Sequence, residues 1–142
     1  MTEALVIDAS VAVKWFVREP DSDLAIAVLK SRADFHAPSL LLLEVARAFQ
    51  KRAFDGFLPA ERVEAAMGEL RKYVRQWVVL ESLVDEALRM AIAIGHPVYD
   101  CVYLALARRM GARMITAEAK FSQKIAATPL ARHVVHLSNW RP

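Results

Sequence analysis

The sequence lacks several features that assign a chain to a common protein class. It has one cysteine, Cys101, among 142 residues, which excludes an intramolecular disulfide and favours a reducing compartment. No apolar run approaches the ~18–20 residues that a membrane span needs. The first ten residues, MTEALVIDAS, contain a glutamate and no basic region, unlike a signal peptide. We therefore expect a cytoplasmic protein without a membrane segment.

The motifs of several enzyme classes are also missing. The chain has only 4 glycines and contains neither a glycine-rich phosphate loop nor a GxSxG elbow. We expect Cys101 to be a buried packing thiol, since free cysteines are usually buried. Four histidines follow no zinc-binding pattern, and the last two are expected to be packing or surface residues: His36, His96, His133 and His136.

The composition predicts one compact domain over residues 1–142. The chain is 56% hydrophobic and 25% charged, which is typical of a folded core and not of disorder. Its formal net charge of +3 is compatible with an anionic partner. Clusters of basic residues are either solvated helix faces or parts of a phosphate-binding track. They are Arg47, Lys51 and Arg52; Arg71, Lys72 and Arg75; and Arg108, Arg109 and Arg113.

Short apolar strands alternate with helices along the chain. Strands are expected at 3–7, 35–37, 78–80, 113–116 and 133–137. Helices are expected at 11–17, 24–32, 40–54, 59–74, 84–94, 99–110 and 119–126. This alternation predicts an α/β fold, a three-layer α/β/α sandwich with a mostly parallel central sheet. Ligand sites in such sheets form beyond the carboxyl ends of the strands.

Two carboxylates directly follow predicted strands. Asp8 is the lone charge in ALVIDASVAV, and Glu118 follows the 113–116 strand within TAEAKF. An ordinary alternative is that both are helix caps, because Asp and similar side chains often bond to nearby backbone amides. Thr116 has the same alternative.

Two further carboxylates lie within apolar helices. Glu44 is the only charged residue in FHAPSLLLLEVA, and Asp100 is the only acid or base, Tyr aside, in PVYDCVYLALA. An isolated buried carboxylate is unstable unless it is paired, protonated or bound to a metal. The ordinary alternatives are an ion pair between Glu44 and Arg47, and a favourable position for Asp100 in the first turn of its helix.

Together these acids indicate a metal site. Carboxylates brought within a few ångströms repel one another, which raises their pKa values, and a divalent cation removes the conflict. Oxygen ligands of this kind suit Mg²⁺ or Mn²⁺. We expect Asp8, Glu44 and Asp100 to hold the metal, with Glu118 completing the acidic set.

The order of the segments VIDASVAVKWF, LLLEVARAF, YDCVYLALAR and ITAEAKF resembles the PIN domain family, and within it the VapC-type toxins of bacterial toxin–antitoxin pairs. The resemblance covers nearly the whole chain. It implies Mg²⁺- or Mn²⁺-dependent endonuclease activity on RNA. By position, Asp8, Glu44 and Asp100 match the first three acids of the family, and Ser10 and Thr116 match the hydroxyl residues that support the first and last acids.

One departure from the family pattern concerns the fourth acid. The family usually has TAD, whereas this chain has Thr116-Ala117-Glu118. Glutamate is one methylene longer, so Glu118 reaches the site through a different rotamer, acting through water or at a second metal. Two functions follow: cleavage of structured RNA by metal-activated water, leaving a 5′-phosphate and a 3′-hydroxyl, or a degenerate PIN domain that binds RNA or a partner without cleavage.

The resemblance also implies partners besides RNA. VapC-type toxins are commonly held inactive by a small VapB-like antitoxin that packs into a groove near the site, and they often form homodimers. Helices 24–32 and 40–75 are the expected walls of such a groove. Lys14 and Arg47 lie about one helical turn beyond Ser10 and Glu44, so either is expected to face the site.

Overall fold

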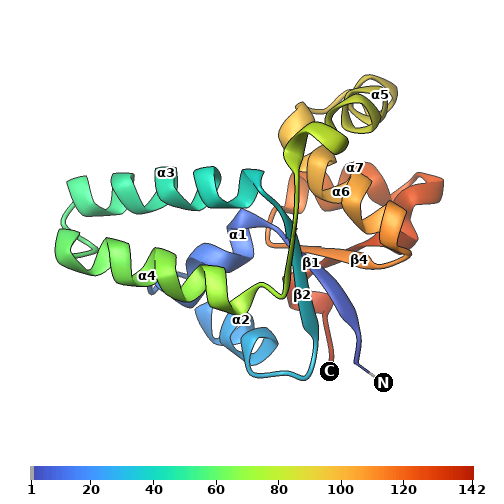
Figure 1. The fold of residues 1–142 in the computed structure, drawn as a ribbon. Helices are drawn as coiled ribbons and strands as arrows, with labels where there is room; N and C mark the ends of the chain where they lie inside the picture. Colours follow the sequence, from blue (N-terminus) through green and yellow to red (C-terminus); the bar gives the residue numbers. More distant parts are fainter. Residues whose placement is uncertain (1) are drawn as a thin grey trace.

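The computed structural model describes residues 2–142 and contains a five-stranded sheet between two layers of helices (Figure 1). The strand order is β3-β2-β1-β4-β5, and every neighbouring pair is parallel. The strands are β1 (Ala4–Ile7), β2 (Asp34–Pro38), β3 (Gln76–Val78), β4 (Arg113–Thr116) and β5 (Val134–His136). The predicted three-layer α/β/α fold is confirmed, with a sheet that is parallel throughout.

Helices α1–α4 lie on one side of the sheet and α5–α7 on the other (Figure 1). Right-handed crossovers explain this division, because β1 to β3 progress toward one edge whereas β4 and β5 lie toward the other. The helices are α1 (Ala9–Ala12), α2 (Ser22–Leu29), α3 (Leu40–Phe54), α4 (Ala60–Tyr73), α5 (Val84–Ile94), α6 (Val98–Met110) and α7 (Ala119–Ala126). Short 3-10 helices are η1 (Val13–Trp15), η2 (Leu80–Ser82), η3 (Pro129–His133) and η4 (Leu137–Asn139).

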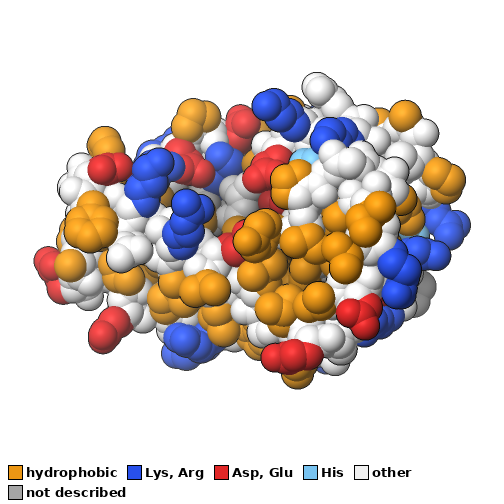
Figure 2. Space-filling view, turned by 90° about the horizontal axis from the view of Figure 1, so that it is seen from above, with side chains coloured by type: hydrophobic (Ala, Val, Ile, Leu, Met, Phe, Trp, Pro, Cys, Tyr) orange, Lys and Arg blue, Asp and Glu red, His pale blue; other side chains and the backbone are white. Residues whose placement is uncertain are grey.

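Helices α5 and α6 form a closely packed pair joined by a sharp turn, with a bend of 115° between them. Within residues 2–142 no single helix is long and apolar enough to cross a membrane, and these two meet the criteria only as a bent pair. Hydrophobic side chains gather on the face of the molecule that looks upward in Figure 1 (Figure 2). Exposed apolar side chains of α5 and the start of α6 are Val84, Leu88, Ile92 and Tyr99.

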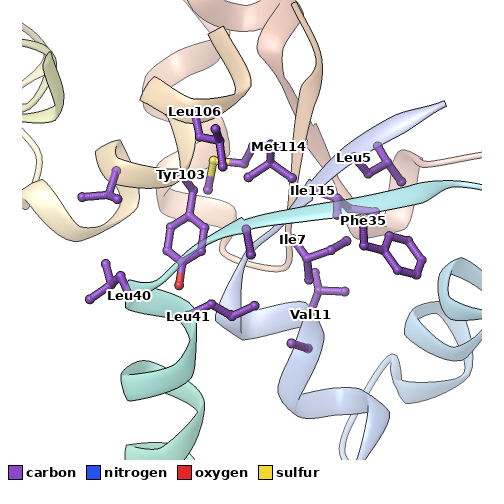
Figure 3. Close-up of a cluster of buried hydrophobic side chains, with 14 of the residues drawn as sticks. Leu5, Ile7, Val11, Phe35, Leu40, Leu41, Tyr103, Leu106, Met114 and Ile115 are labelled. Carbon is purple, nitrogen blue, oxygen red and sulfur yellow. The ribbon is translucent and has the colours of Figure 1, made fainter. Parts of the chain in front are cut away.

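The hydrophobic core is centred on β1, β4 and α6. Leu5 and Ile7 of β1 and Ile115 of β4 have no solvent exposure, as expected for strands covered on both faces. All residues from 101 to 107 of α6 are buried, Cys101 included, so the helix is apolar around its whole circumference. Figure 3 shows Tyr103 among these core side chains, with its hydroxyl directed toward the beginning of α3.

The two central strands end side by side. Ile7 of β1 pairs with Ile115 of β4, and the amide of Asp8 donates to the carbonyl of Ile115 at 3.2 Å. After β1 the chain continues to β2, on one side of the central pair, and after β4 it continues to β5, on the other side. Such a reversal of strand order leaves a crevice at the carboxyl ends of the two strands. Residues directly after β1 and β4 therefore meet at one place.

Some predicted boundaries are wrong. A continuous helix over 11–17 does not form, because α1 ends at Ala12 and the tighter turn η1 follows. In η1 the Trp15 indole donates to the carbonyl of Ala25 and its ring packs on Phe35. These tertiary contacts, and not local helix propensity, determine the backbone conformation after Ala12. The strand predicted at 78–80 is β3 at 76–78, since the ladder to β2 ends at Val78 and the next residue is 60% exposed.

Candidate active site

Asp8 is a buried carboxylate at the end of β1. The residue is only 3% exposed. It occupies the position before α1, but its side chain makes no capping hydrogen bond. Instead Oδ2 accepts hydrogen bonds from the hydroxyls of Ser10 at 2.5 Å and Thr116 at 3.0 Å. The simple helix-cap interpretation of Asp8 is therefore wrong.

The same two hydroxyls also join the carboxyl end of β4 to this site. The amide of Ala117 donates to Ser10 Oγ at 2.9 Å, and the amide of Glu118 donates to Thr116 Oγ1 at 3.1 Å. Each hydroxyl thus accepts from the backbone after β4 while it donates to Asp8. Ser10 and Thr116 therefore both lie beside Asp8, and each also bonds to the backbone that leads to Glu118.

Glu44 projects from α3 toward the buried helix α6. Its Oε1 accepts a hydrogen bond from the hydroxyl of Tyr103 at 2.5 Å. Among residues 2–142 Glu44 forms no ion pair with Arg47, so that alternative is wrong. A fully buried tyrosine needs a hydrogen-bond partner, and the Glu44 carboxylate supplies it.

Asp100 lies in the first turn of α6 and has two close neighbours. The Nε2 atom of His96 is 2.6 Å from Asp100 Oδ2. One ligand atom each of His96, Asp100 and Glu118 lies within 4.8 Å of the other two. Two ligands of one Mg²⁺ ion, each at about 2.1 Å, are at most ~4.2 Å apart, so the trio has about the spacing of an ion-bound set.

Burial and mutual repulsion raise the pKa of all four acids. Burial raises the pKa of Asp8 to about 6; the hydrogen bond from Ser10 opposes this rise, and the charges of Glu118 and Glu44 add to it. Burial is also the largest cause of the raised pKa of Asp100, followed by the charge of Asp8. Partial burial, together with a hydrogen bond and the charge of Asp100, raises the pKa of Glu118 to about 7.

Glu44 belongs to the same electrostatic group. Burial raises its pKa, the Tyr103 hydrogen bond opposes the rise, and the charge of Glu118 adds to it. The pKa of Tyr103 is raised well above 10 by burial and then by the charges of Asp8 and Glu44. Tyr103 therefore stays a neutral donor beside three acids.

The donor set fits a divalent cation. Within the described residues none of the four acids forms an ion pair with a lysine or arginine, and the one ion pair among them joins Asp100 to His96. Converging carboxylates without a compensating cation oppose their own ionisation. Mg²⁺ and Mn²⁺ prefer oxygen ligands of this type. Asp8, Glu44, Asp100 and Glu118 are the residues that would hold such an ion.

A groove of about 780 Å³ opens from the acids along α3. Glu44 and Glu118 line it near the site, and Phe57 lines it beyond the end of α3. The expected walls are partly confirmed, since α3 contributes many lining residues and α2 and α4 none. The lining residues are Ala9, Ser10, Val13, Glu19, Glu44, Arg47, Ala48, Gln50, Lys51, Arg52, Phe54, Asp55, Phe57 and Glu118.

The basic side chains along the groove differ in whether they form an ion pair with an acidic residue of the chain. Arg52 is held in an ion pair with Glu19, whereas Arg47 and Lys51 form no ion pair within residues 2–142. Arg47 lines the groove as expected. Lys14 does not, because its Nζ is bound to Glu19 at 3.1 Å and to a backbone carbonyl at 2.8 Å.

Two residues of the site escaped the sequence analysis, Tyr103 and His96. For Tyr103 a signal existed, because a tyrosine in a wholly apolar helix requires a partner and Glu44 is the lone charge of another apolar helix. For His96 the signal was its spacing of four residues from Asp100, but Pro97 lies between them and a helix stop was the simpler interpretation.

We predict that Asp8→Asn changes how stability depends on pH in the metal-free protein. The pKa of Asp8 is about 6 in the fold, against an ordinary value of 3.8. The unfolded chain therefore loses this proton first, and the fold loses stability as pH rises from about 4 to 6. The asparagine variant lacks this loss. Its free energy of unfolding relative to wild type should rise by about 3 kcal/mol over that range, at about 1.4 kcal/mol per pKa unit.

Urea unfolding with EDTA present, at several values between pH 4 and pH 7, measures this difference. Asp85→Asn, at an exposed carboxylate of α5, is the matched control and should parallel wild type. A difference between Asp8→Asn and wild type that stays constant with pH would contradict the burial argument.

Comparison with known proteins agrees with this geometry. The family model of the PIN domain matches residues 5–126. A relative named ribonuclease VapC3, from Pyrobaculum aerophilum, is 28% identical over 125 residues, which are 87% of this chain and 95% of the relative.

Two solved structures share the fold. A crystal structure of a Pyrobaculum aerophilum protein has a TM-score of 0.68 and 21% identity, covering 96% of this chain and 85% of the other. A toxin–antitoxin complex from Klebsiella pneumoniae has a TM-score of 0.63 and 14% identity, covering 94% and 97%. With the family model matched over most of its length, the chain belongs to the PIN domain family.

Proposed function

We propose that residues 1–142 act as a single PIN-like domain, a Mg²⁺- or Mn²⁺-dependent endoribonuclease that cleaves structured RNA as the toxin of a type II toxin–antitoxin pair. One observation carries the proposal. Asp8, Glu44, Asp100 and Glu118 converge where β1 and β4 end, all with raised pKa values and none in an ion pair with a lysine or arginine of the described chain. The relative named ribonuclease VapC3 supports the nuclease assignment.

The chain's own residues hold the acids in position. Ser10 and Thr116 fix one oxygen of Asp8, and Tyr103 fixes one oxygen of Glu44, so the other oxygen of each carboxylate is left for a cation. When bound, Mg²⁺ or Mn²⁺ supplies charge that polarises the scissile phosphate and eases deprotonation of the attacking water. Hydrolysis then leaves a 5′-phosphate and a 3′-hydroxyl without a covalent enzyme intermediate.

The groove accounts for binding of the RNA backbone. Arg47 and Lys51 line it without ion-pair partners in the described chain, and such side chains neutralise phosphates without reading sequence. Glu19, Glu44, Asp55 and Glu118 line the same groove, so the acids oppose binding of a polyanion until a cation is present. We therefore propose that metal and RNA bind cooperatively.

A second function, binding of RNA or a partner without cleavage, is favoured by Glu118. This residue is the outermost of the four acids and is exposed, whereas Asp8 is buried. Its longer side chain places the carboxylate within 4.8 Å of ligand atoms of Asp100 and His96. Cleavage of structured RNA that is lost with EDTA would support the nuclease; RNA binding without cleavage would support the second function.

We predict that Asp100→Asn abolishes the cleavage. The substitution removes a charge that would hold the cation, and the rate should fall at least ~100-fold, about 2.7 kcal/mol of transition-state stabilisation. Metal-free Asp100→Asn should unfold at a higher temperature than wild type at neutral pH, because the amide relieves repulsion from Asp8. The measurements are cleavage of structured RNA with Mn²⁺ and thermal unfolding with EDTA.

Asp85→Asn, outside the site, is the control for both measurements and should retain wild-type cleavage. Full activity in Asp100→Asn would remove this residue from the mechanism, and equal loss in the control would point to damage of the fold.

We also propose a VapB-like antitoxin as a partner in the cytoplasm. A neighbouring fold is named a toxin–antitoxin complex, and the groove beside the acids offers a place for a peptide segment. Phe54 and Phe57 are 82% and 71% exposed at its far end, which gives apolar surface for such a segment to cover.

The other proposed partner is a second copy of this chain. Val84, Leu88 and Ile92 are four residues apart on α5 and form one stripe, with Leu88 50% and Ile92 75% exposed. Helix α5 lies at the top of Figure 1, the side seen in Figure 2, where hydrophobic side chains gather. A face of this kind suits a self-complementary interface about a two-fold axis.

We predict that Ile92→Glu makes the protein monomeric. A charge in the centre of an apolar interface is desolvated without a partner, so the dimer should dissociate while the fold stays intact. Sedimentation velocity at micromolar concentration measures the state. Leu24→Glu, at an exposed leucine of α2, is the control and should remain dimeric; a monomeric wild type would contradict this assignment.

A further inference from the structure

His96 lies in a turn whose backbone has little freedom. Gly95 ends α5 with φ of +67°, a conformation that favours glycine, and the amides of Gly95 and His96 both donate to the carbonyl of Ala91, at 2.9 and 3.1 Å. Pro97 follows directly and restricts φ. Lys124 of α7 donates to the carbonyl of Gly95 at 2.6 Å. The turn is therefore held from both helices and from α7.

The ring of His96 is held as well. Its centroid lies 4.8 Å from that of Phe121 on α7, and the Phe121 side chain is fully buried. Nε2 lies 2.6 Å from Asp100 Oδ2. The other ring nitrogen, Nδ1, is buried and has no hydrogen-bond partner within the described part of the chain. One nitrogen of the imidazole thus faces the acids and the other faces the core.

This asymmetry determines the tautomer. A proton on Nδ1 would be a buried N–H donor without an acceptor, which is unfavourable. A buried Nδ1 lone pair without a donor costs less free energy. The proton of the neutral ring therefore lies on Nε2, where Asp100 Oδ2 accepts it. With its lone pair on Nδ1 and a hydrogen on Nε2, the ring has no free electron pair directed at the acids.

We infer that His96 is a positioning residue, which holds Asp100 for cation binding by donating Nε2–H to Oδ2 and does not itself coordinate the metal. The inference rests on the proposed nuclease function and assigns the role of a residue beyond the four acids. It also corrects the simplest interpretation of the compact trio His96, Asp100 and Glu118 as a histidine-containing metal site. The imidazole is bound to Oδ2 of Asp100, and this carboxyl group has a second side-chain hydrogen bond, with Glu118.

The test compares a variant that keeps an N–H donor with one that removes it. The side-chain amide of His96→Gln reaches about as far as Nε2 and can donate to Asp100, whereas His96→Leu cannot. Calorimetric titration of Mn²⁺ into each metal-free protein, without RNA, reads metal affinity independently of activity. Loss of a hydrogen-bond partner of a metal ligand typically weakens binding ~10–100-fold.

We expect His96→Leu to lose affinity for Mn²⁺ by this factor, and His96→Gln to stay within about threefold of wild type. His133→Leu is the matched control and should bind as wild type does, because the His133 ring contacts the carbonyl of Ala112 before β4 begins, at the opposite end of the strands from the acids. Circular dichroism and thermal unfolding establish that each variant is folded. His96→Leu binding Mn²⁺ as tightly as wild type would overturn the inference.

Pulsed electron paramagnetic resonance of bound Mn²⁺ gives a second, direct reading. We expect no ¹⁴N coupling from a coordinated imidazole in wild type or in His96→Gln. A coupling in wild type that His96→Gln removes would make His96 a ligand and overturn the inference, even if His96→Leu does not fold.

The experiments distinguish failure of the proposed nuclease function from failure of the inference about His96. If wild type neither binds Mn²⁺ nor cleaves RNA, the proposed function and the inference both fall. If wild type does both and His96→Leu is unimpaired, only the inference falls.

Discussion

The burial of the Asp8 carboxylate is the physical constraint on which the rest of the site depends. Asp8 follows the central strand β1, is 3% exposed and has no lysine or arginine partner in the described chain. Burying such a charge is unfavourable unless hydrogen bonds or a counter-charge compensate it. Ser10 and Thr116 compensate part of it, and they do so by joining α1 to the end of β4. The hydrogen bonds that stabilise the acid therefore also close the crevice between the two strands, and the remaining deficit is what a divalent cation would supply.

The other acids are positioned by side chains of rigid elements. Tyr103 comes from the fully buried part of α6 and bonds to Glu44 on α3, so the core helix orients an acid on the opposite side of the sheet. His96 comes from the constrained turn before α6 and contacts Asp100. Sites held by packed helices and strands keep their geometry better than sites on loops. Repulsion among the acids raises their pKa values and opposes the stability of the metal-free fold.

The groove and the exposed apolar stripe lie on different helical layers. The groove along α3 is lined mainly by residues of the α1–α4 layer and contains Glu44 and Glu118 together with Arg47 and Lys51. The apolar stripe of Leu88 and Ile92 belongs to the α5–α7 layer (Figure 2). The proposed RNA or antitoxin segment and the proposed second copy of the chain are thus assigned to different surfaces.

Local patterns in the sequence were sufficient to predict the alternation of strands and helices and to single out the four acids as candidates, because an isolated charge in an apolar run is visible without a structure. Tertiary packing decided the rest. The start of β3 depended on its ladder with β2, and η1 depended on the contact of Trp15 with Ala25. Tyr103 and Glu44 are 59 residues apart and Ser10 and Ala117 are 107 apart. Periodicity reveals which face of a helix is buried but not which other element covers it, so these partners could be known only once the sheet order had brought their helices together.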